Sequence, residues 1–156
     1  MKNVLLILCL AGGLSACKKD KFESVPQIEF IDVVRNVVPR QLTSLEKDLA
    51  PILRIKVRDA EGDFGRPGTT DSSSIIIKHL LTNDVDSVPF PDLSRAPKSN
   101  FEADVEVNLF GSIGCLSGGP ARPRVDTIFY QVYIRDGKNN KSNVITTSVP
   151  VLRTCE

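Results

Sequence analysis

The stretch Ile52–Arg58, ILRIKVR, decides the fold class of this 156-residue chain. Apolar and basic side chains alternate along it, so that Leu53, Ile55 and Val57 share one face of an extended segment while the basic side chains share the other. Successive side chains of a β-strand point to opposite faces, and a period of two is typical of a strand with one buried face. The stretch therefore predicts a β-strand that covers a hydrophobic core.

Further runs rich in β-branched residues lie on both sides of this stretch, separated by clusters of Gly, Pro, Asn and Asp. They span residues 28–38, 74–81, 102–110, 125–135 and 143–152. Short strands at this spacing, without a long helical pattern, are typical of an antiparallel β-sandwich. Thr43 and Glu46 fit a capping box before one helical turn, and a plain loop is the alternative there. We expect a single all-β domain over residues 27–156.

The first sixteen residues have the layout of a secretory signal peptide. Lys2 provides the positive start, Val4–Leu10 is apolar, and the small residues Ser15 and Ala16 precede Cys17. The apolar run is much shorter than the roughly 20 residues that a membrane-spanning helix needs. We therefore expect residues 1–16 to be a signal peptide that is removed.

The sequence Leu14-Ser15-Ala16-Cys17 resembles the lipobox of bacterial lipoproteins. In that family the cysteine becomes the first mature residue, and its thiol carries a diacylglycerol. The resemblance implies that Cys17 is lipidated, that residues 17–26 form a polar tether, and that the chain reaches its membrane through this lipid anchor. Stable anchoring takes more than one acyl chain, which a lipobox cysteine provides. An ordinary cleaved signal with a chance cysteine is the alternative.

The composition of the mature chain excludes some classes of function. Lys2 is the only charged residue of the signal, so 19 of the 20 basic residues remain beside 19 acidic ones. Binding to nucleic acid needs clustered Lys and Arg, and this balance argues against it. The motifs GxSxG, HExxH and CxxC and the P-loop are absent from the sequence, and the single histidine, His79, lies within an apolar run. We expect the protein not to be an enzyme.

Two of the four cysteines are expected to pair. Cys9 leaves with the signal and Cys17 is assigned to the lipid, which leaves Cys115 and Cys155 in an oxidising compartment. A disulfide between them closes a loop of 40 residues and contributes on the order of 4 kcal/mol by the chain-entropy model. The alternative is a nucleophilic Cys115 with His79 as its base.

The loop that follows the opening stretch, Asp59-Ala60-Glu61-Gly62-Asp63-Phe64-Gly65, is the strongest candidate for a metal site. Carboxylates at alternate positions are the ligands that a hard cation such as Ca²⁺ prefers, and Asp71 can add a fourth oxygen. Asp59, Glu61, Asp63 and Asp71 are therefore the candidate ligands, with calcium as the candidate cofactor. A turn in which Asp and Gly serve backbone geometry alone is the alternative.

Two blocks of the chain resemble small envelope lipoproteins of the Bacteroidota: the Asp/Gly loop ending in Asp63-Phe64-Gly65, and the segment 126–145, DTIFYQVYIRDGKNNKSNVI. The resemblance implies an immunoglobulin-like sandwich anchored at the cell envelope, in the outer membrane, and leaves open whether it faces the periplasm or the surface. It carries no activity over to this chain. Glu61 stands where the family usually has Asp, and Ala60 where it has Gly, which weakens the expectation of a shared cation site.

The order of the strands predicts which loops share an end of the sandwich. Consecutive antiparallel strands run end to end, so we expect loops 59–73 and 111–124 at the end where the tether enters, and loops 82–101 and 136–142 at the other end. Cys115 and Cys155 then lie at the tether end, close enough to pair.

Three functions are compatible with these features. The first is a lipid-anchored, non-catalytic binding or accessory module, with a protein or glycan partner at the long loop 82–101. A packed loop that covers a sheet edge is the alternative for that segment. The second function is a calcium-structured adhesion or scaffold domain. The third is a small envelope hydrolase. The sequence names neither the ligand nor the oligomeric state.

Overall fold

The computed structural model describes residues 22–65, 73–91, 93, 95–96 and 98–156. Two short 3₁₀ turns, η1 (Ser44–Leu49) and η2 (Phe110–Ser112), lie among strands. The strands are β1 (Gln27–Val34), β2 (Val37–Val38), β3 (Ile52–Asp59), β4 (Ser74–His79), β5 (Val85–Pro89), β6 (Phe101–Asn108), β7 (Arg124–Ile128), β8 (Tyr130–Arg135), β9 (Ile145–Thr146) and β10 (Val151–Cys155).

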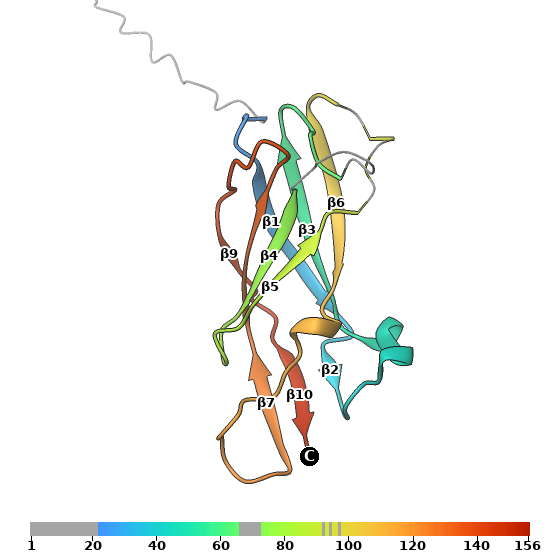
Figure 1. Cartoon of the computed structure of the whole chain (residues 1–156), viewed down its shortest axis with the longest axis vertical. Helices are drawn as coiled ribbons and strands as arrows, with labels where there is room; N and C mark the ends of the chain where they lie inside the picture. Colours follow the sequence, from blue (N-terminus) through green and yellow to red (C-terminus); the bar gives the residue numbers. More distant parts are fainter. Residues whose placement is uncertain (1–21, 66–72, 92, 94, 97) are drawn as a thin grey trace, which may run out of the picture.

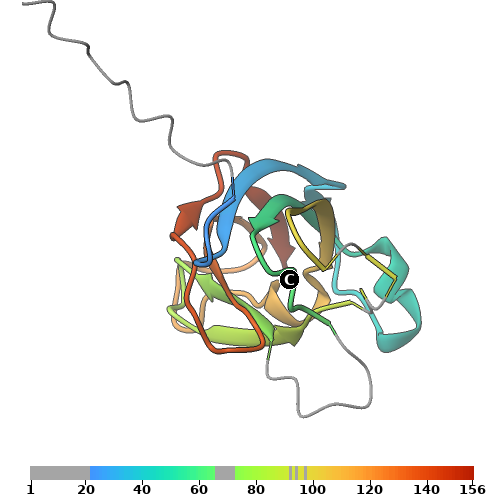
Figure 2. The ribbon, with the colours of Figure 1, turned by 90° about the horizontal axis from the view of Figure 1, so that it is seen from above.

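The strands form three small sheets with the orders β1-β3-β6, β5-β4-β8-β9 and β2-β10-β7. Every pairing is antiparallel except that of β2 with β10, which is parallel. The first two sheets lie on opposite sides of the domain, while β7 and β10 continue toward the end where the chain finishes (Figure 1, Figure 2). The expected all-β, antiparallel architecture is confirmed, and its immunoglobulin-like subclass stays a prediction.

The opening stretch behaves as its alternation predicts. Leu53, Ile55 and Val57 of β3 are each 0% exposed and belong to the main hydrophobic core. The opposite face of β3 carries basic side chains that meet acids on the neighbouring strands, as where Lys56 Nζ lies 2.9 Å from Asp104 Oδ1. Surface ion pairs of this kind add little stability, so burial of the apolar face is the main contribution of β3.

Three of the expected strands are each divided in two. The run 28–38 breaks at Arg35, whose φ of 54° belongs to the left-handed region. The run 125–135 breaks at Phe129, because β7 belongs to one sheet and β8 to another. The run 143–152 likewise becomes β9 and β10, again in different sheets. In the runs 125–135 and 143–152 local alternation cannot reveal the break, because the burial of the side chains continues to alternate across it. In the run 28–38 the alternation is already interrupted by a register shift between Phe30 and Asp32.

The predicted arrangement of loops at the two ends is wrong for loop 111–124 and the turn 136–142. The loop after β3 lies at the expected end, where Ala60 N donates to Glu23 O. Strand β5 lies inside the expected loop 82–101 and returns the chain to the end where β4 begins. Its residues are exposed or half-buried, so its sequence, VDSVP, lacks the apolar signal of a core strand. Loop 111–124 therefore lies at the end opposite the described start of the chain, and the disulfide lies there with it (Figure 1). The turn 136–142 lies beside the loop after β3, because Gly137 N donates to Asp63 O at 3.0 Å.

Two local features hold the ends of the strands in place. The capping box is present, with Thr43 N donating to Glu46 Oε2 at 3.0 Å, and it begins the 3₁₀ turn η1. Tyr130, which is 0% exposed, donates from its hydroxyl to the carbonyl of Ser112 at 2.9 Å. This bond ties the start of β8 to η2, which forms part of the site described next.

Candidate functional site

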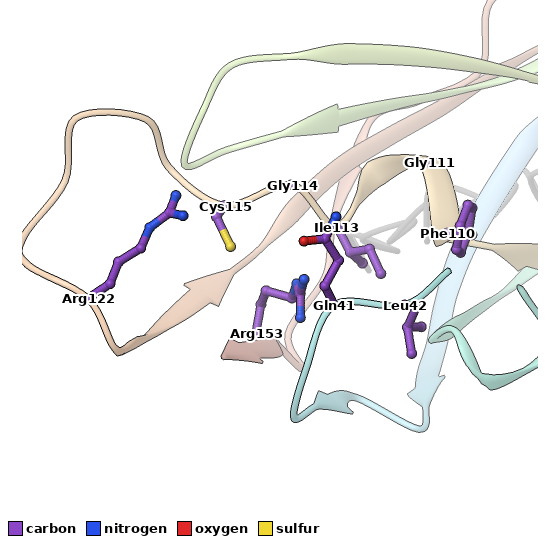
Figure 3. A pocket seen from close by; sticks show the side chains of 9 residues that line it. All are labelled: Gln41, Leu42, Phe110, Gly111, Ile113, Gly114, Cys115, Arg122 and Arg153. Atoms are coloured by element: carbon purple, nitrogen blue, oxygen red, sulfur yellow. The ribbon is translucent and has the colours of Figure 1, made fainter. Parts of the chain in front are cut away.

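A pocket of about 430 Å³ lies at the disulfide end of the domain. Its walls come from the segment after β2, from η2 and the loop that follows it, and from β10 (Figure 3). The wall contains apolar side chains, an amide, two glycines and two arginines. The lining residues are Gln41, Leu42, Phe110, Gly111, Ile113, Gly114, Cys115, Arg122 and Arg153.

Arg153 is the unusual member of this wall. It alternates with Val151 and Cys155 on the inward face of β10 and is only 6% exposed. Its Nε and Nη1 have no hydrogen-bond partner in the described part of the chain. Burial lowers the pKa of the Arg153 guanidinium, yet an arginine remains charged at neutral pH. The pocket is thus bordered by a buried cation with unused N–H donors (Figure 3).

The acid that lies opposite Arg153 in the sheet is already bonded to other groups. Asp126 of β7 lies opposite Arg153 in the register and is 6% exposed. It accepts from Arg124 Nε at 2.7 Å and from Leu116 N at 2.9 Å. The Arg124 guanidinium holds the pKa of Asp126 below its usual range. Arg122 donates to the main-chain oxygen of Glu156 at 2.8 Å. The lining itself includes two arginines and no carboxylate. The nearby negative charge of Glu156 acts against burial and raises the pKa of Arg153.

The expected disulfide joins two walls of the pocket. Cys115, after η2, bonds to Cys155 at the end of β10, with an S–S distance of 1.93 Å. In the described ranges, the sulfurs of these cysteines and the carboxylate of Asp126 are the one group of metal-ligand atoms that lie within 4.8 Å of one another. Sulfurs bonded to each other are not the thiolates that a metal takes. The bond holds the loop after η2 against the strand that bears Arg153.

The proposed calcium ligand Asp59 acts in a turn. It is 0% exposed, and its Oδ2 accepts from Glu61 N at 3.0 Å and Gly62 N at 2.6 Å. Its Oδ1 has no partner in the described residues. Burial, together with the nearby Asp63, raises the pKa of Asp59 to about 6 despite the two amide donors. The turn geometry that we gave as the alternative is therefore present.

The other proposed ligands do not gather around Asp59. Asp63 Oδ2 lies 3.9 Å from Lys138 Nζ, and burial is the main cause that raises the pKa of Asp63. Within the described ranges, Asp59, Glu61 and Asp63 do not bring one ligand atom each within 4.8 Å of the others. Asp71 lies outside the described residues. The contacts of Asp59 and Asp63 favour the turn alternative over the calcium site.

The remaining predicted residues fall in different places. Cys17 and the signal 1–16 lie outside the described residues. No helix in the described part of the chain is long and apolar enough to span a bilayer. His79 is 3% exposed, and its Nδ1 accepts from Thr82 N at 3.1 Å. Phe90, in the expected partner loop 82–101, is 7% exposed and stacks on Phe64 with ring centroids 4.6 Å apart. Phe90 is thus part of the core, as the packed alternative for this loop predicts.

Sequence reasoning missed the arginines of the pocket. The expected last strand ended at residue 152, one position before Arg153. The Arg153 side chain was therefore not assigned to the inward or the outward face of a strand. Continuing the alternation from Val151 to Cys155 places Arg153 inward, between two buried residues. The signal that could have indicated the site is a charged residue at an inward-facing position of a strand.

Comparison with protein-family models, curated proteins and solved structures gives no match for this chain.

Proposed function

We propose that this chain is a non-catalytic binding module, held at the cell envelope by a lipid on Cys17, with its ligand in the pocket beside Arg153. The sequence motif Leu14–Cys17 supports the anchor, and the resemblance to envelope lipoproteins supports the outer membrane as its place. The pocket supports the binding role, because its volume falls in the range of small-molecule sites, about 300–1,000 Å³.

The main support for this proposal is that the pocket and the segment before β1 lie at opposite ends of the domain. The segment before β1 lies beside the loop after β3, where Ala60 N donates to Glu23 O at 3.0 Å. Strand β10, which contributes Arg153 to the pocket, lies at the opposite end (Figure 1). Strands β7 and β8, which run almost end to end, span roughly 35 Å at the usual rise per residue. A lipid on Cys17, five residues before Phe22, would leave the pocket facing away from the membrane.

The chemistry of the lining supports binding without catalysis. General acid–base catalysis uses a group that gains and loses a proton near the working pH. The lining offers two arginines, an amide and apolar side chains, and Cys115 is held in a disulfide. Arginine does not release its proton near neutral pH. These groups can orient and neutralise an anion.

The anchor is tested by metabolic labelling with an alkyne-bearing fatty acid in a bacterial host that makes the full chain. We expect label on the wild type and none on Cys17→Ser, which should also remain at the size of the unprocessed precursor. Equal labelling of both proteins would refute the anchor at this position.

The binding role is tested by a thermal-shift screen of neutral, cationic and anionic metabolites. The matched variant is Leu42→Trp, which adds bulk to a half-buried lining position. We expect at least one compound to raise the Tm of the wild type and to have no effect on the variant. A screen in which every compound acts equally on both proteins would refute a binding role for this pocket.

A further inference from the structure

The buried guanidinium of Arg153 restricts the chemistry of the ligand. A buried donor without a hydrogen-bond partner destabilises the protein, because it has lost its bonds to water and gained none. Nε and Nη1 of Arg153 both lack a partner in the described residues, and the register neighbour Asp126 is bonded to Arg124 and Leu116. A ligand that supplies acceptor atoms here relieves this cost. Arginine pairs best with planar oxyanions, because its N–H groups form a rigid fork that matches a carboxylate.

The rest of the lining favours an apolar ligand body. Ile113 is buried, and Leu42 and Phe110 are half-buried. Leu42 comes from the segment after β2, Phe110 and Ile113 come from η2 and its C-cap, and all three line the same space as Arg153 (Figure 3). A bare inorganic anion would leave this apolar surface without a contact, whereas an organic group would remove it from water.

We infer that the pocket binds a small organic acid, whose carboxylate accepts hydrogen bonds from Arg153 and whose apolar part packs against Leu42, Phe110 and Ile113. Exposed Arg122 lies at the same wall, where it donates to the main-chain oxygen of Glu156. This inference rests on the proposed function and names the class of its ligand. It requires both parts of the ligand, the charge and the apolar group.

The test uses four probes with the full chain in a non-ionic detergent. Benzoate has both parts, benzamide has the ring without the charge, and acetate and inorganic phosphate have the charge without the ring. Dissociation constants come from chemical-shift titration. We expect benzoate to bind at least about tenfold more tightly than benzamide, which lacks the charge-assisted hydrogen bond. A preference of similar size is expected over acetate and phosphate, which lack the ring that the apolar wall would remove from water.

Two variants with the same change of charge locate the contact. Arg153→Met should weaken benzoate binding by about tenfold or more. Arg135→Met, at the end of β8 beside the turn 136–142, should leave it unchanged. Arg153→Met is expected to fold, since it removes a group without a partner, and its melting curve in the same detergent verifies this.

Three results would overturn the inference that the ligand is an organic acid. Equal affinity for benzoate and benzamide, or equal affinity of wild type and Arg153→Met, would overturn the organic acid while leaving a binding pocket in place. Failure of benzoate to bind at millimolar concentration would also overturn it. The metabolite screen with Leu42→Trp decides the proposed function separately, because a neutral or cationic compound can pass that screen.

Discussion

Replacing Arg153 by methionine is expected to make the ligand-free protein more stable. The side chain is 6% exposed, and two of its nitrogens have no partner in the described residues. Methionine fills similar space without donors. Replacement of buried charges by apolar side chains of similar volume often stabilises a protein by about 1–4 kcal/mol, and we expect about 2 kcal/mol here. For a chain of this size, that gain corresponds to a rise in Tm of roughly 4–8 °C.

The assay is reversible thermal unfolding followed by circular dichroism, with Arg124→Met as the matched control. Arg124 also lies in the sheet of β10, but its guanidinium bonds to Asp126 and to the carbonyl of Pro120 at 2.7 Å each. Its loss leaves a buried carboxylate unpaired, which typically costs about 3–5 kcal/mol. The two variants should therefore shift the Tm in opposite directions. If Arg153→Met loses stability as Arg124→Met does, the guanidinium has partners in the free protein, and the reasoning that assigns it to a ligand is refuted.

Three further predictions concern the rest of the domain. Burial raises the pKa of Asp59 to about 6, above its unfolded value of about 3.9. The contribution of Asp59 to the free energy of unfolding is therefore present below pH ~4 and disappears as the pH rises through ~6, a loss of about 2 kcal/mol. Asp59→Asn should flatten this part of the pH–stability profile, and an unchanged slope in urea titrations would contradict the assignment. Replacing both Cys115 and Cys155 by serine should lower the free energy of unfolding by about 4 kcal/mol. If a urea titration shows a loss below about 1 kcal/mol, removal of the disulfide gives the unfolded chain little additional conformational freedom. Millimolar calcium added after EDTA should leave the Tm unchanged, because Asp59 Oδ2 is bonded to backbone amides and Asp63 lies near Lys138; a rise that Asp63→Ala abolishes would instead establish a cation site.

Much of the fold follows from local patterns. Leu53, Ile55 and Val57 alternate with basic residues, and this alternation places them in the core whichever strands lie beside β3. The cysteine pair could also be predicted, because elimination left only Cys115 and Cys155. The candidate site is different, since of its nine lining residues sequence analysis singled out only Cys115.

Tertiary structure alone decided where the chain changes sheets and which loops meet. Strand β5 has no fully buried residue and only Val88 packs against the core, so its pairing with β4 is what identifies it. Its presence reverses the direction of β6 relative to our expectation. The reversal moves the disulfide to the end opposite the loop after β3.

The sequence by itself determined the all-β class, the core face of β3 and the pairing of the cysteines, because each depends on local alternation or on composition. Tertiary structure decided that Arg153 is buried and that η2 and β10 enclose a pocket around it. The physical reason is that the burial of a charged side chain depends on which distant segments cover it. Here those segments are the chain after β2 and the loop that Cys115 ties to β10.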